Sequence, residues 1–153
     1  MAGLLVAVAL VATACNMPDL EEEEARADPL AQTSMVFDAN GKRLLRLHAE
    51  EDRTVIPHQR IPDVARDAVV AIEDKRFWSH RGVDLKALIR AAYVNASEGR
   101  VAQGGSTITQ QYVKNTLVGT DRTLERKVRE ARLAWELEKK YSKEEILGRY
   151  MNT

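Results

Sequence analysis

The segment from Glu73 to Gly82 holds the residues best suited to acid–base chemistry, in the order Glu-Asp-Lys-Arg-Phe-Trp-Ser-His-Arg-Gly. Glu73 follows the apolar run 68–72, so we expect its carboxylate to lie at the edge of a hydrophobic core, partly buried. Partial burial raises the pKa of a carboxylic acid, which makes it a general base usable near neutral pH. The alternative is a helix that ends in solvated charges. His80 is expected to hold the Glu73 loop by a hydrogen bond; a second base is the alternative, because histidine titrates near neutral pH.

Three further segments place polar and charged side chains where they could bind a ligand. Residues 104–111 read Gly-Gly-Ser-Thr-Ile-Thr-Gln-Gln. The glycine pair lets the backbone approach a ligand closely, and the hydroxyls and amides offer uncharged hydrogen-bonding groups. The alternative for these hydroxyls is to cap a helix. Residues 126–130 read Arg-Lys-Val-Arg-Glu, and residues 143–152 read Lys-Glu-Glu-Ile-Leu-Gly-Arg-Tyr-Met-Asn.

In this order the four segments resemble the motifs of the family 51 peptidoglycan glycosyltransferases. These are the transglycosylase domains of class A penicillin-binding proteins and the related monofunctional enzymes. The resemblance runs from about residue 34 to residue 153. It implies a lysozyme-like helical fold on the outer face of the cytoplasmic membrane, and an enzyme that polymerises lipid II. The donor is then the growing glycan on undecaprenyl pyrophosphate, and the nucleophile is the 4-hydroxyl of an incoming GlcNAc, with inversion to a β-1,4 bond.

The resemblance also implies roles for individual residues. Glu73 matches the catalytic base, which takes the proton of the acceptor hydroxyl, and Glu130 matches the second glutamate of the family. Cations are needed around the departing pyrophosphate, because negative charge develops there in the transition state. The candidate substrate-binding residues are Arg90, Ser106, Gln110, Gln111, Lys114, Arg122 and Arg129.

Two interpretations of Glu130 remain open. It lies on the expected helix one turn from Arg126 and Lys127, the spacing of ordinary surface ion pairs. In the functional interpretation it orients those cations, or helps to hold a divalent cation (Mg²⁺ or Mn²⁺) on the pyrophosphate; no other cofactor is expected. Arg122 and Arg129 are expected on one side of this helix, with Arg126 and Lys127 on other faces in solvent.

Composition narrows the function classes. The chain has 153 residues, 44% hydrophobic and 30% charged, which fits one globular domain with a tail. Its one cysteine, Cys15, excludes an internal disulfide, and three scattered histidines without cysteine partners argue against a zinc site. Aromatic residues make up 5%, which argues against an aromatic-rich nucleic-acid surface. The formal net charge is zero, but residues 104–153 have a basic excess that suits an anion or an anionic membrane.

Residues 1–16 are expected to direct export. Residues 2–14 are almost wholly apolar, but this run is shorter than the roughly 20 residues of a membrane-spanning helix, and no basic residue precedes it. Two alternatives remain open, a signal anchor and a lipoprotein-type signal in which Cys15 is lipidated. Both place the bulk of the chain on the extracytoplasmic face of the cytoplasmic membrane. Residues 17–33, with four consecutive glutamates, are predicted to form an acidic, solvated linker.

The expected fold is mainly α-helical, with a small β-hairpin before the helices. The hairpin covers residues 34–47, with Asn40 and Gly41 in a type I′ turn, and must pack on another element to be stable. A short third strand is expected at 54–56. Helices are predicted at 63–72, at 84–98, from 106 or 107 to about 117, at 121–141, and from 143 to the end of the chain.

The C-terminal segment predicts an incomplete domain. We expect residues 34–153 to be the N-terminal part of a truncated glycosyltransferase domain, inactive alone. The reason is an apolar face with no later residues to cover it, formed by Ile146, Leu147, Tyr150 and Met151.

Two other functions compete with polymerisation. A lysozyme-like hydrolase would cut the same polymer and keep a glutamate, but would not need the cationic residues. A non-catalytic envelope module would bind a lipid carrier or a protein of the division or elongation machinery. Gly148 stands where the fourth motif of the family usually has a glutamate, which leaves the role of that position open. A transpeptidase domain in a longer parent is neither indicated nor excluded.

Overall fold

The computed structural model describes residues 18–48, 52–100, 104–121 and 123–153. This part of the chain is mainly helical, with one antiparallel two-stranded hairpin. The signal predicted at residues 1–16 lies outside it, and none of the helices described is both long and apolar enough to cross a membrane. The α-helices and strands, in chain order, are α2 (Leu20–Arg26), β1 (Ser34–Phe37), β2 (Arg43–Leu47), α3 (Asp63–Glu73), α4 (Leu85–Glu98), α5 (Ile108–Val113), α6 (Leu124–Lys140) and α7 (Lys143–Tyr150).

The short helix α2 corrects the prediction of a solvated linker for residues 20–26, whereas residues 27–33 have no helix or strand. Asp19 caps it by accepting the backbone N–H of Glu22 at 2.9 Å, and acidic residues in its first turn favour a helix N-terminus. Leu20 is buried, and its backbone N–H donates to Glu136 on α6 at 3.1 Å. Glu23 pairs with Arg129 and Glu24 with Lys140, both on α6, so basic side chains of that helix hold the acidic run in place.

The hairpin forms in the predicted place, with Ser34 opposite Leu47. Its turn is not type I′, because that turn needs positive φ at both central residues and only Gly41 has it, at +78°. The N–H of Gly41 donates to the carbonyl of Asp38 at 3.0 Å, and the Asp38 carboxylate accepts the N–H groups of Asn40 and Lys42. An aspartate at the first turn position thus selects a turn that places only the glycine in the left-handed region.

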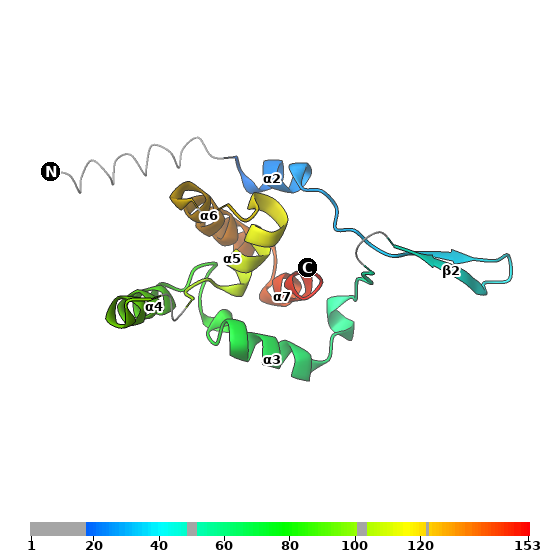
Figure 1. Ribbon diagram of the computed structural model, residues 1–153. Coiled ribbons are helices and arrows are strands. Elements are labelled where there is room, and N and C mark those ends of the chain that lie inside the picture. The colour runs from blue at the N-terminus through cyan, green and yellow to red at the C-terminus, as the bar shows by residue number, and fades with distance from the viewer. Residues whose placement is uncertain (1–17, 49–51, 101–103, 122) are drawn as a thin grey trace.

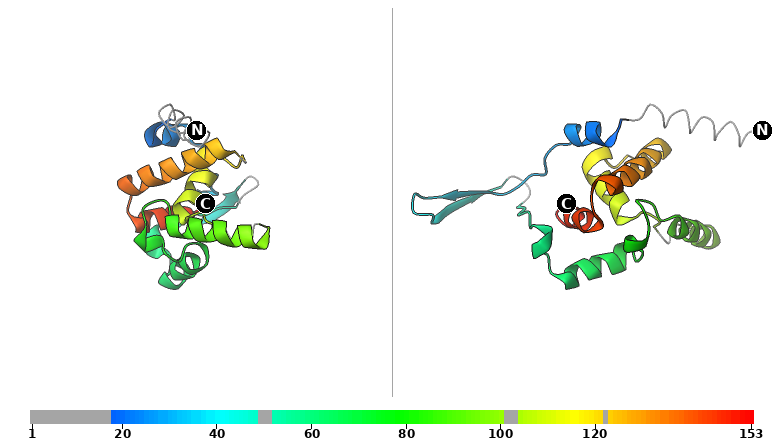
Figure 2. Two further views of the ribbon diagram at one scale, coloured as in Figure 1. Left: turned by 90° about the vertical axis from the view of Figure 1, so that its left-hand side faces the viewer. Right: turned by 180° about the vertical axis from the view of Figure 1, so that it is seen from behind.

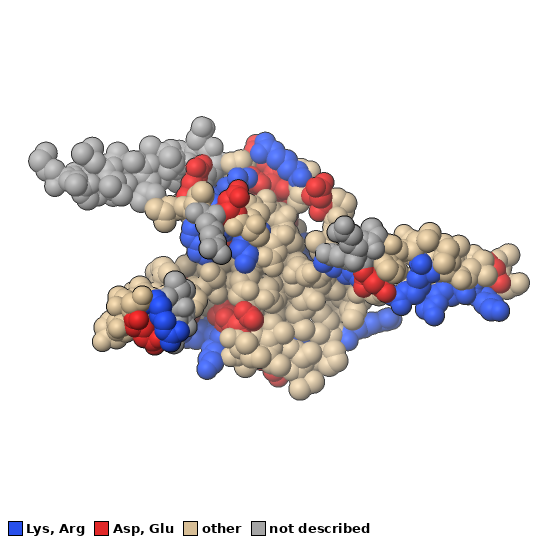
Figure 3. Space-filling view, viewed as in Figure 1, with Lys and Arg blue, Asp and Glu red and all other residues tan. Residues whose placement is uncertain are grey.

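The expectation that the hairpin packs on another element is wrong for the residues described. Every residue of both strands is exposed, and the hairpin projects away from the helices (Figure 1; Figure 2, right). Basic side chains gather along one side of it (Figure 3). The predicted third strand at 54–56 is also absent from the described chain. The side-chain amide of Asn152 instead pairs with both backbone groups of Ile56, at 2.8 and 2.9 Å.

Four of the five predicted helices begin at residues whose side chains satisfy free backbone N–H groups. Asp84 caps α4, Thr107 forms a capping box with Gln110 at the start of α5, and Ser142 forms one with Glu145 at α7. Helix α6 begins after the cap residue Thr123, slightly later than expected. The predicted helix to about 117 is interrupted, since α5 passes into a π-helical turn over Lys114–Val118.

The core of the described chain lies between α5, α6 and α7, which meet at the centre of Figure 1. Of the apolar face expected to lack cover, Ile146 and Leu147 of α7 are fully buried there, whereas Tyr150 and Met151 are half-buried. Helix α7 ends at Tyr150 and does not run on to Thr153. Helix α4 lies to one side of the other helices (Figure 1). It buries only Ala91, which leaves most of its apolar residues exposed.

Gly148 is buried in α7, where it lies against His58. A Cβ atom at position 148 would lie far inside van der Waals contact of the His58 Cβ. The glutamate that the family resemblance leads one to expect here therefore cannot fit unless His58 moves.

Gly148→Ala is expected to lower the free energy of unfolding by about 1–3 kcal/mol, the usual cost of overpacking a well-filled site. Urea unfolding followed by circular dichroism measures this change. Adding His58→Gly removes the clashing atom and should recover part of the loss. A Gly148→Ala protein as stable as the parent would show that the contact with His58 is not formed.

Candidate active site

A cleft of about 430 Å³ lies between the end of α3, the start of α4 and the loop before α5. Its wall consists of residues 72–76, Asp84, Ala87, Arg90 and residues 104–107. Of the residues expected in the site, Glu73, Arg90 and Ser106 therefore line one cleft. The others that the structure describes, Gln110, Gln111, Lys114, Arg129 and Glu130, lie outside this wall.

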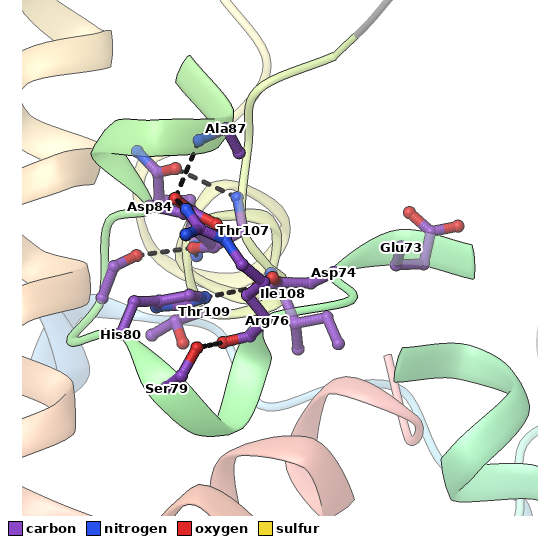
Figure 4. A network of polar contacts seen from close by, with 12 residues as sticks. Glu73, Asp74, Arg76, Ser79, His80, Asp84, Ala87, Thr107, Ile108 and Thr109 are labelled. Carbon is purple, nitrogen blue, oxygen red and sulfur yellow. Dashed lines mark hydrogen bonds and ion pairs between the residues drawn. The ribbon is translucent and has the colours of Figure 1, made fainter. Parts of the chain in front are cut away.

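Beneath the cleft, Asp74 joins the end of α3 to the start of α5. Its carboxylate is buried, and Oδ2 accepts from His80 Nε2 at 2.8 Å and from the backbone N–H of Ile108 at 3.2 Å (Figure 4). The carboxylate thus satisfies a free donor at a helix N-terminus. The prediction that His80 holds the Glu73 loop is confirmed, because it is bonded to the residue that follows Glu73.

Asp84 and Gly82 fasten the same loop to two more helices. Asp84 accepts from the backbone N–H of Ala87 at 2.8 Å, which caps α4, and both of its oxygens receive the guanidinium of Arg76. The hydroxyl of Thr107, at the start of α5, donates to the carbonyl of Gly82 at 2.5 Å. Residues 74–84 therefore set the relative positions of the three helix ends around the cleft.

Asp74, His80 and Asp84 each offer a ligand atom, and these atoms lie within 4.8 Å of one another. Their hydrogen bonds do not fit a metal centre, because His80 is bonded to Asp74 and the Arg76 guanidinium already neutralises Asp84. We interpret the cluster as a hydrogen-bonded support for the cleft. Sequence reasoning identified Asp84 as a cap but missed Arg76, whose partner eight positions away is set by the loop.

Glu73 is the last residue of α3 and is exposed, so the expectation of partial burial is wrong. The reason is that α3 buries only Val70, and the apolar run before Glu73 is mostly exposed. Figure 4 shows the Glu73 carboxylate directed away from the Asp74 network. Its Oε2 accepts from the side-chain amide of Gln111, on α5, at 3.0 Å. Gln111 therefore contacts the candidate base directly, although it does not line the cleft.

Glu130 is almost completely buried, with 1% of its surface exposed. One oxygen accepts from Arg126 at 2.5 Å, and the other pairs with Lys127. Lys127 also donates to Ser106 on the cleft wall at 2.9 Å. The expectation that Arg126 and Lys127 are simply solvated is therefore wrong, because the face of α6 that carries them packs inward.

This pairing bears on the divalent cation considered for Glu130. Both carboxylate oxygens already contact cationic side chains, so the donor set around Glu130 does not fit a metal ion. The contacts of Glu130 with Arg126 and Lys127 fit both remaining interpretations, a structural ion pair and a residue that orients these cations.

The remaining expected residues are held elsewhere or not described. Arg129 pairs with the buried Glu23 of α2. Gln110 is buried and its side chain accepts from the backbone N–H of Thr107 at 3.1 Å, which completes a helix cap. Lys114 is half-buried in the π-helical turn, away from the cleft wall. Arg122 lies outside the described residues.

Comparison with known proteins matches the arrangement of these motifs to one family. A model of the family described as Transglycosylase matches residues 40–153. Penicillin-binding protein 1A/1B of Bacillus subtilis (strain 168) is 41% identical over 146 residues, which is 95% of this chain and 16% of that protein. Penicillin-binding protein 1A of Aquifex aeolicus (strain VF5) is 43% identical over 150 residues, which is 98% of this chain and 20% of that protein.

A third relative, penicillin-binding protein 1A of Clostridium tetani (strain Massachusetts / E88), is 42% identical over 127 residues. These residues are 80% of this chain and 16% of that relative. The chain thus spans between 16% and 20% of the length of these three relatives. From the family match over residues 40–153 and the identity across most of its length, the chain belongs to the transglycosylase family.

Proposed function

We propose that this chain forms part of a peptidoglycan glycosyltransferase, which polymerises lipid II into β-1,4-linked glycan strands. The observation that carries the proposal is a cleft shared by an exposed carboxylate, Glu73, and a cation, Arg90. A second cation, Lys127, reaches the same wall through its hydrogen bond to Ser106. Family membership supports the assignment. A lysozyme-like fold for the complete domain, and a place on the outer face of the cytoplasmic membrane, belong to the same proposal.

The reaction is an inverting glycosyl transfer from a lipid pyrophosphate. The 4-hydroxyl oxygen of the acceptor sugar attacks the anomeric carbon of the donor as the bond to the pyrophosphate oxygen breaks. The electron pair of that bond leaves with the pyrophosphate, and Glu73 takes the proton of the hydroxyl. A positioned general base contributes about 10²- to 10⁴-fold to a rate of this kind.

The cations act on the leaving group. Negative charge grows on the pyrophosphate in the transition state, and fixed positive charges next to it stabilise that state. Arg90 lines the cleft, and Lys127 is oriented toward Ser106 by its pairing with the buried Glu130. We therefore include Lys127 among the cations that stabilise the leaving pyrophosphate. Arg129 is not included, because it forms an ion pair with Glu23.

Lys127→Met is expected to slow polymerisation by about 10²-fold, the loss typical when one group that stabilises developing charge is removed. Methionine keeps much of the apolar stem, and Glu130 retains its bond to Arg126. The initial rate of lipid II consumption measures the effect. The matched control is Lys139→Met on the same helix, since Lys139 stacks over Trp135 and lies outside the cleft wall. Equal rates for the two variants would remove Lys127 from the mechanism.

The function itself is tested with lipid II in detergent micelles. The samples are this chain and the longest polypeptide that its gene encodes. We expect glycan chains to grow, and a moenomycin-type phosphoglycolipid that mimics the donor to block their growth. Release of soluble sugars from finished peptidoglycan, without consumption of lipid II, would instead support a hydrolase. If the longest polypeptide acts on neither substrate, only a binding role remains and the proposal fails.

A further inference from the structure

Gln111 forms a bridge between the candidate base and the last residue of α7. Its side-chain Nε2 donates to Oε2 of Glu73 at 3.0 Å, and its Oε1 accepts from the hydroxyl of Tyr150 at 3.1 Å. The three residues come from three different elements, α3, α5 and α7. In the described part of the chain, no donor contacts the other oxygen of Glu73, Oε1.

The direction of this bridge follows from the chemistry of Tyr150. Burial, and then the negative charge of Glu73, raise the pKa of Tyr150 above its ordinary value. The phenol therefore keeps its proton and acts as a donor to the nearest acceptor. When the amide oxygen of Gln111 accepts the hydrogen bond from this phenol, its NH₂ group is directed toward the carboxylate of Glu73. Without the phenol, the amide oxygen loses its donor, and the contact with Glu73 alone is left to hold the Gln111 side chain in place.

We propose that Tyr150 is a positioning residue for the general base, which acts by fixing the orientation of the Gln111 side chain. Gln111 then holds Oε2 of Glu73 and leaves Oε1 to accept the proton of the sugar hydroxyl. Glu73 needs this support because it is exposed at the end of a helix, where few contacts limit its rotation. The inference rests on the proposed function.

Tyr150→Phe is expected to lower kcat by about 3- to 10-fold, the effect of losing one hydrogen bond of ordinary strength. KM should stay within about twofold, because the bridge holds the base and does not touch the substrate. Phenylalanine keeps the ring that packs against the core, so the change is confined to the hydroxyl. The matched control is Tyr141→Phe, which removes a hydroxyl that donates to Glu24 at 3.0 Å and takes no part in the bridge.

A double-mutant cycle separates positioning from general stability. In the Gln111→Met background, Tyr150→Phe should leave kcat unchanged, because the hydroxyl no longer has an amide to orient. An equal loss of kcat in both backgrounds would show that Tyr150 acts by a route other than Gln111. A loss confined to KM would show that the hydroxyl contacts the substrate. Either result overturns the inference.

A measurement without substrate distinguishes failure of this inference from failure of the proposed function. In isotope-labelled protein, the side-chain amide resonances of Gln111 should move on Tyr150→Phe and on Glu73→Gln, but not on Tyr141→Phe. If the Gln111 resonances change in neither the Tyr150→Phe nor the Glu73→Gln protein, the bridge is overturned, even in an active enzyme. Resonances that respond as expected in a protein that does not consume lipid II would uphold the bridge and refute the function.

Discussion

Glu73→Gln is expected to slow glycan polymerisation by about two to four decades, the contribution of a positioned general base. Glutamine has nearly the same shape and still accepts the hydrogen bond from Gln111, so the cleft should keep its geometry. What is lost is an oxygen that can take the proton of the acceptor hydroxyl. The measurement is the initial rate of lipid II consumption at saturating substrate, with thermal unfolding as a check on the fold.

The matched control for this change is Glu98→Gln. Glu98 is also the last residue of a helix, α4, and is also exposed, but it pairs with Arg100 and lies outside the cleft wall. Its replacement should leave the rate within about twofold, the change expected for an exposed ion pair of small energy. Polymerisation by the Glu73→Gln protein at the parent rate would refute the assignment of the base.

Gly82→Ala is expected to lower the free energy of unfolding by about 2–5 kcal/mol. The residue has φ +71°, a conformation that costs an L-amino acid about 1–2 kcal/mol. A Cβ there would also lie 2.7 Å from backbone atoms of Ala134 and Trp135, which adds about 1–3 kcal/mol of overpacking. Backbone atoms in a helix cannot turn aside as a side chain can, so the loop itself must move. Urea unfolding measures the loss.

Gly99→Ala isolates the conformational part of this effect. Gly99 has a similar φ, +63°, but nothing lies within 4 Å of the position a Cβ would take. Its replacement should cost only about 1–2 kcal/mol, the conformational part of the Gly82→Ala effect alone. Equal losses for the two variants would show that the loop 74–84 does not lie against α6.

Local signals in the sequence located most of the elements. Asp84 and Ser142 were recognised as helix caps because a cap needs only the residue and its next three neighbours. The glycine at position 41 marked the hairpin for the same reason. The turn type was wrong because Asp38, two positions before Asn40, competes for the same backbone donors.

The errors in the site come from contacts between distant segments. Helical spacing shows which residues of α6 share a face, but not which face packs inward. It therefore does not reveal that Lys127 contacts Ser106 or that Arg129 pairs with Glu23. Arg129 pairs with Glu23, which lies 106 positions earlier in the chain. Composition alone predicts that this acidic segment is a linker, so it gives no sign of the contact. The sequence predicts partial burial of Glu73 from the apolar residues that precede it, but most of those residues are exposed in the structure.

The support beneath the cleft has a consequence for fragments of the chain. Asp74 and Ile108 are 34 positions apart, Gly82 and Thr107 are 25 apart, and Ser106 and Lys127 are 21 apart. Each of these contacts closes a long loop and therefore costs conformational entropy. None of them persists without the hydrophobic core, whose burial offsets that cost. A peptide that carried only the Glu-Asp segment would keep the carboxylate but would have no binding site for a sugar. Competence for chemistry is thus a property of the assembled helices and not of any one motif.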